Sequence, residues 1–191
     1  MGHAIDTLRS YFENNGLHYN ELDGNDETAR IGWVLGAKSA RYEVHAQDLT
    51  TGHLWIYVTA PIRVPERLRT RVAELLAWLN FGLRWGAFEI DPNDGELRHR
   101  SGGLVPQGEA GHEIVEDLYK QSCQIMEDFF PLLSEGTFSS DPVDVTYRRL
   151  NSAMSGGDPK PAAGADVSEV LAAVDEIGRR APELDQEVPR H

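Results

Sequence analysis

The chain has 191 residues, 40% of them hydrophobic, and a formal net charge of −13 at pH 7, which fits one globular domain with an appendage or two small domains. The acidic charge disfavours binding to nucleic-acid phosphates or anionic lipids, and no stretch reaches the about 18 apolar residues of a membrane helix. Cys123, the single cysteine, excludes an internal disulfide. With no secretory signal layout, we expect a cytoplasmic protein.

The first half of the sequence predicts a helix, three strands and a second helix. Apolar residues at helical spacing place the first helix over residues 4–15. Alternating or continuous apolar residues predict three strands, which cover residues 29–36, 41–49 and 53–60. Pro65 then suits the first turn of a helix over residues 65–84, whose leucines fall on one stripe.

The second half predicts a hairpin followed by helices. Strands over residues 87–91 and 96–100 flank the turn Pro92-Asn93-Asp94-Gly95. A long helix over residues 112–133 is expected to end at Pro131. Asp141-Pro142 opens a further helix, and another apolar stripe lies in residues 166–178, at Val167, Val170, Leu171, Val174 and Ile177.

Together these elements predict an α+β domain over residues 1–135. Its order is helix, three strands, helix, two strands, helix, with a five-stranded, mainly antiparallel sheet packed by helices. A C-terminal helical extension follows. It comprises an additional helix over 136–154, a linker over 155–165, and an amphipathic helix with a polar tail over 166–191.

A motif within residues 75–105 resembles that of a known family. It consists of Leu79-Asn80, Gly86-x-Phe88, Asp91 and Gly95. In this motif, and in the element order over residues 1–135, the chain resembles the YbjN family, whose members are expected to share the fold of type III secretion chaperones. The resemblance implies a small, acidic, dimeric and non-enzymatic protein that holds extended segments of partner proteins. It also implies that the helix at 65–84 takes part in dimerisation.

That helix is apolar on two sides. At about 100° per residue, Trp78 and Phe81 project roughly opposite the leucine stripe. We therefore predict a homodimer interface at Ala77, Trp78, Phe81 and Trp85. The alternative is that the C-terminal helices cover this patch within one chain, through Tyr147 and Leu150 or through Val170 and Val174.

Apolar residues of the first helix and first strand are candidates for binding an extended polypeptide at the face or edge of the sheet. They are Leu8, Tyr11, Phe12, Ile31 and Trp33. Core packing explains the same residues equally well, and full burial of their side chains would rule the binding role out.

Several single residues have structural explanations. Asn80 is expected to bond the backbone beyond its helix, and Asp91 belongs to a hairpin turn rather than to a calcium loop, because the ligand spacing is wrong. Cys123 is expected to be an inert, buried thiol. Four arginines, at positions 63, 67, 69 and 71, fit a solvated face that could meet an acidic tail of a partner or of the chain itself.

The leading hypothesis is a cytoplasmic, non-enzymatic, chaperone-like or regulatory protein that binds another polypeptide as a homodimer. No nucleophile elbow, phosphate loop or zinc spacing appears in the sequence, so we expect no catalytic residue, metal or cofactor. The alternative is a small-molecule-sensing or structural module, with a pocket between sheet and helices lined by Trp55, Tyr57 or Trp85.

Overall fold

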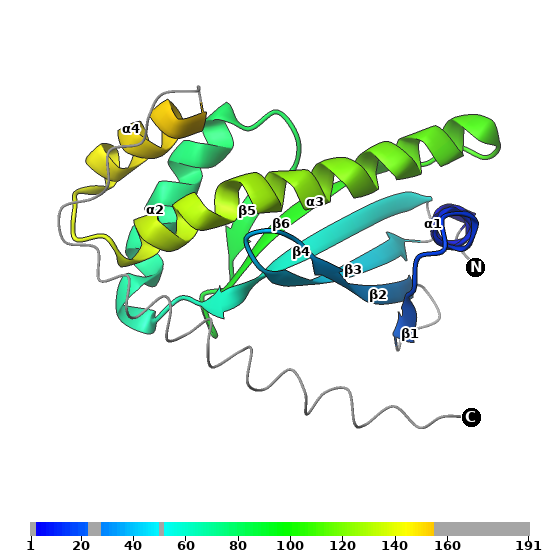
Figure 1. Cartoon of the computed structure of the whole chain (residues 1–191), viewed down its shortest axis with the longest axis horizontal. Coiled ribbons are helices and arrows are strands. Elements are labelled where there is room, and N and C mark those ends of the chain that lie inside the picture. Colours follow the sequence, from blue (N-terminus) through cyan, green and yellow to red (C-terminus); the bar gives the residue numbers. More distant parts are fainter. Residues whose placement is uncertain (1–2, 23–27, 50–51, 155–191) are drawn as a thin grey trace.

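The computed structural model of the chain describes residues 3–22, 28–49 and 52–154 (Figure 1). Within this part of the chain the helices are α1 (His3–Asn14), α2 (Glu66–Gly82), α3 (Glu109–Phe138) and α4 (Val143–Met154). The strands are β1 (Asn20–Leu22), β2 (Thr28–Gly36), β3 (Arg41–Leu49), β4 (His53–Arg63), β5 (Ala87–Ile90) and β6 (Glu96–Leu104). The expected linker over 155–165 and the amphipathic helix and tail over 166–191 lie outside the described residues.

The strands form one sheet in the order β1-β2-β3-β4-β6-β5, and every neighbouring pair is antiparallel. The α+β class and the element order are therefore confirmed, with six strands where five were expected. The additional strand is β1, which pairs with β2 over Asn20–Leu22 alone. Three exposed residues carry no readable alternation, so the sequence pattern could not reveal it.

Helices cover one face of the sheet. In β3, Tyr42, Val44, Ala46 and Asp48 are buried while the residues between them are more exposed, as expected for a strand with one face in the core. In Figure 1, α3 runs along the sheet, with α1 beside its N-terminal half and α2 and α4 against its C-terminal half. The hydrophobic core lies between this helical layer and the sheet.

The helix α3 does not end at Pro131, as the sequence suggested, but continues to Phe138. Proline inside a helix removes one backbone hydrogen bond and costs about 3 kcal/mol. Pro131 itself is exposed, whereas Phe130 and Leu133 beside it are buried, so packing of these side chains offsets the cost. The expected domain boundary at residue 135 consequently falls inside α3.

Candidate functional site

The outer side of α2 carries an exposed aromatic patch. The leucine stripe packs into the core through Val72, Leu75, Leu76 and Leu79. The four residues predicted for a dimer interface remain exposed, and we call them the α2 patch: Ala77, Trp78, Phe81 and Trp85. Phe81 is 95% exposed, Trp85 59% and Trp78 48%. Large aromatic side chains gathered on a surface are typical of protein interfaces.

The helix α4 covers part of the α2 patch. The ring of Tyr147 lies 5.3 Å from that of Trp78, Leu150 is buried, and Arg71 donates from Nη2 to the Thr146 hydroxyl at 3.0 Å. The contact of Tyr147 with Trp78 agrees with part of the intramolecular alternative. It leaves Phe81 almost fully exposed, so α4 alone does not bury the patch.

Hydrogen bonds hold the C-terminal end of α2 against the neighbouring hairpin. Asn80 donates from Nδ2 to the carbonyl of Phe88 at 2.9 Å and accepts from the Phe88 amide at 2.8 Å, which confirms its expected backbone role. Buried His99 donates from Nε2 to the carbonyl of Trp85 at 3.2 Å. Burial lowers the pKa of His99, so its imidazole is neutral near pH 7. The C-terminal end of α2, which carries the aromatic patch, is thus hydrogen-bonded to β5, and the carbonyl of Trp85 to β6.

The other motif residues shape the hairpin itself. The backbone of Gly95 has a φ of +78°, and a Cβ there would lie 2.1 Å from the carbonyl oxygen of Val64, so glycine is required. The carboxylate of Asp91 accepts the amide of Asn93 at 2.7 Å, which lowers the pKa of Asp91. This is the expected turn. The motif residues therefore shape the hairpin and its contact with α2, and none of these interactions points to a reaction.

Four of the five residues predicted to bind a polypeptide are core residues, and that part of the prediction is wrong. Leu8, Phe12 and Ile31 are at most 1% exposed, and Trp33 is 6% exposed. The reason is that the apolar side of α1 packs against the inner side of β2, with the rings of Phe12 and Trp33 4.8 Å apart. Tyr11 remains partly exposed.

A groove of about 560 Å³ lies beside this cluster, between the end of β2 and α3. It is lined by Leu35, Ala37, Tyr119, Lys120, Gln121, Cys123, Gln124 and Glu127. Burial raises the pKa values of the Tyr119 hydroxyl and the Cys123 thiol to about 12, so both are neutral near pH 7. These groups provide apolar walls rather than a nucleophile, in agreement with the inert thiol expected at position 123.

The edge of β2 next to this groove is only partly paired. The strand β1 pairs with Arg30, Ile31 and Gly32. Along Trp33–Gly36, no strand in the described part of the chain pairs with that edge. We call these four residues the free β2 edge. Sequence reasoning named this strand but missed the groove, because the groove is completed by residues of α3 about 90 positions later.

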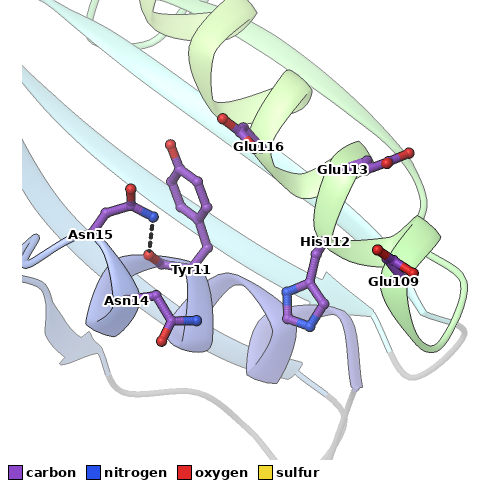
Figure 2. A pocket seen from close by; sticks show the side chains of 7 residues that line it. All are labelled: Tyr11, Asn14, Asn15, Glu109, His112, Glu113 and Glu116. Carbon is purple, nitrogen blue, oxygen red and sulfur yellow. Dashed lines mark hydrogen bonds between the residues drawn. The ribbon is translucent and has the colours of Figure 1, made fainter.

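Figure 2 shows a second hollow, of about 440 Å³, between α1 and the first turns of α3. Three of its seven lining residues are glutamates, and the full lining is Tyr11, Asn14, Asn15, Glu109, His112, Glu113 and Glu116. Neither hollow is lined by the residues proposed for a small-molecule pocket. Trp55 and Tyr57 lie instead on the open face of the sheet, where Arg100 and Arg98 stack over their rings at 4.8 Å.

The described part of the chain contains neither a cluster of metal-binding side chains nor a membrane-spanning helix. In residues 3–22, 28–49 and 52–154, no three His, Cys, Asp or Glu side chains gather closely enough to hold a metal ion. Within the same ranges, no helix combines the length and the apolar character needed to cross a membrane.

Comparison with known proteins identifies a similar fold. No family model and no curated protein sequence matches this chain. Among solved structures, a chain in the crystal structure of the ExsC–ExsE complex matches with a TM-score of 0.50 and 16% sequence identity. The match covers 70% of this chain and 97% of that chain. Identity this low speaks to the fold alone, and that fold is of the α+β class expected from the sequence.

Proposed function

We propose that this chain is a cytoplasmic, non-enzymatic, chaperone-like protein of the YbjN family that binds an extended segment of another polypeptide and acts as a homodimer. The observation that carries the proposal is the free β2 edge beside an apolar groove. The similar solved structure is a complex of two named proteins, which supports a role in binding polypeptides.

The free β2 edge offers backbone groups to an added strand. A peptide laid along Trp33–Gly36 could form main-chain hydrogen bonds, while every second side chain enters the groove. The position of the groove is fixed, because the carboxylate of Glu127 accepts the amide and the hydroxyl of Ser39 at 2.8 and 2.6 Å. The preferred ligand is therefore an extended segment with apolar residues at alternate positions.

A labelled peptide of alternating valine and serine tests this binding by fluorescence polarisation. Leu35→Asp places a charge in the groove and should weaken binding about tenfold or more, since a buried unpaired charge is costly. Val34→Asp is the matched control, because Val34 is 51% exposed and does not line the groove. Equal affinities for both variants, or no binding by the natural protein, would contradict the proposal.

The α2 patch is the proposed homodimer interface. Phe81 and Trp85 expose more than half of their surface, and pairing two such patches would remove this apolar area from water. A contact between the same patch on both chains would give a twofold-symmetric dimer.

Light scattering over a range of protein concentrations tests the dimer. The mass should rise towards that of two chains, and Trp78→Glu should leave a folded monomer because it puts a charge into the interface. Ala73→Glu adds the same charge at an exposed position of α2 outside the patch and should still dimerise. If the natural protein and its Leu171→Asp, Val174→Asp variant both stay monomeric at every concentration, the homodimer is refuted but the peptide binding is not.

A further inference from the structure

The α2 patch is larger than α4 can cover. The helix α4 stacks Tyr147 on Trp78, yet Phe81 remains 95% exposed and Trp85 59% exposed. On α4 itself, Val145 is 45% exposed. The surface contributed by α2 and α4 therefore retains apolar area in the described residues, and α4, which packs on α2, ends at Met154.

The sequence beyond α4 contains a segment suited to this surface. Residues 166–178 repeat apolar side chains at the spacing of one helical face, at Val167, Val170, Leu171, Val174 and Ile177. The same thirteen residues include four acidic side chains and no basic one, namely Asp166, Glu169, Asp175 and Glu176. An amphipathic segment of this kind binds a hydrophobic groove through its apolar stripe.

The charge of the receiving surface is complementary. On α2, Arg71 lies on the same side of the helix as Trp78 and bonds to a hydroxyl of α4, whereas Arg69 lies on the opposite side and bonds to the carbonyl oxygens of Pro92 and Asn93. Hydrogen bonds to neutral acceptors leave the positive charge of these guanidinium groups in place. Together, α2 and α4 contain five arginines and three carboxylates, the latter at Glu66, Glu74 and Asp144. In a chain with a net charge of −13, these two helices are therefore a comparatively favourable location for an acidic segment.

The linker between α4 and residues 166–178 is long enough for this segment to reach α2. Residues 155–165 can span at most about 36 Å when extended, and α2 is about 25 Å long at 1.5 Å per residue. A short tether also gives the segment a local concentration on the order of millimolar. A second copy of the protein at micromolar concentration competes poorly with such a neighbour.

We propose that residues 166–178 dock on the α2 patch of their own chain and compete with a second copy for it. The docking rests on the exposed patch and the amphipathic segment. Its regulatory consequence rests on the proposed homodimer. The segment makes dimerisation weak in the full chain, and anything that displaces the segment strengthens it.

Variants of the full chain test the competition. Leu171→Asp combined with Val174→Asp places two charges on the apolar stripe and should lower the dimer dissociation constant about tenfold or more. Ser168→Asp combined with Ala172→Asp adds the same charges on the side of the segment opposite the stripe and should leave the constant unchanged. The measurement is sedimentation equilibrium. A dimer that is no tighter in the first variant than in the second overturns the competition.

A cross-linking experiment tests the docking without relying on the dimer. Ala77→Cys is combined with Val170→Cys, or with Ala172→Cys as the control, and a short bis-maleimide is added. The only natural thiol, Cys123, is partly buried, which keeps its background reaction low. We expect a link within one chain, and at higher yield for the pair that includes position 170.

Different experimental results would refute the docking of residues 166–178 and the homodimer. Links that join only positions 77 of two chains would overturn the docking and leave the homodimer intact. A link within one chain in a protein that stays monomeric even as the Leu171→Asp and Val174→Asp variant would support the docking and refute the homodimer. Equal links from positions 170 and 172 would also overturn the docking, because they indicate no preferred face.

Discussion

Two helices of this molecule use aromatic residues in opposite ways. The helix α1 has one apolar side, and Phe12 at its end is 1% exposed, in contact with Trp33 and Tyr119. The helix α2 has two apolar sides, and Phe81 on the second is 95% exposed. Both residues are phenylalanines in regular helices, and the sequence around each predicts a helix equally well.

The difference follows from the geometry of one layer of helices on one face of a sheet. A helix can turn only one stripe of side chains towards the sheet. The single stripe of α1 belongs to the core for that reason. The second stripe of α2 faces outwards and needs another partner, and so a helix with two apolar sides is the better signal of an interface.

The largest expected change in unfolding free energy is for the buried aromatic residue of α1. Phe12→Ala should destabilise the protein by about 3–5 kcal/mol, because it removes a buried ring and leaves a cavity. Urea unfolding followed by tryptophan fluorescence measures the change. A loss below about 1 kcal/mol would mean that α1 is not part of the cooperative core and would undo the contrast with α2.

A smaller effect is expected at the base of the α2 patch. Asn80→Ala removes both hydrogen bonds to the backbone of Phe88 and should cost about 1–3 kcal/mol, since the Phe88 amide and carbonyl lose their partners. Hydrogen exchange at the Phe88 amide should become faster. Unchanged exchange there would show that the patch does not depend on this joint.

On the open face of the sheet, the partly buried side chain of His45 can be tested by changing the pH. Burial, with Arg30 and Arg98 nearby, lowers the pKa of His45 to about 4, and its ring stacks on Tyr57 at 4.5 Å. The folded state binds a proton at His45 less readily than the unfolded state does. The stability that the neutral His45 side chain contributes is therefore fully present above pH 6.5 and is lost as the pH falls towards 4.

His45→Gln should therefore flatten the pH dependence of unfolding free energy between pH 6.5 and 4, by about 1–2 kcal/mol after allowance for partial solvent contact. Guanidinium unfolding at a series of pH values measures this. The same slope in the variant would assign the acid sensitivity to other groups, such as buried His99.

The smallest change in monomer stability is expected for Phe81→Ala. An exposed side chain contributes little to folding, so the monomer should stay within about 0.5 kcal/mol of the natural protein. The same substitution should weaken the dimer by about 2 kcal/mol if Phe81 is a central contact. Loss of stability equal to that of Phe12→Ala would show that Phe81 belongs to the cooperative core and not to an interface.

Much of the fold could be predicted from local patterns. The leucine stripe of α2, the alternation of β3 and the turn around Gly95 each depend on residues close together in the chain. The same holds for the role of Asn80, which bonds a residue eight positions away. The strand β1 and the end of α3 were not predictable in this way, because three residues show no period and packing overrides Pro131.

The sequence by itself determined most of the helices and strands, that α2 has two apolar sides, and that the chain is acidic. Only the tertiary structure decided that Leu8, Phe12, Ile31 and Trp33 are core residues, and that the free β2 edge lies beside a groove completed by α3. Periodicity states which side chains share a face. Burial depends on what packs against that face, and this is settled by contacts between residues far apart in the chain.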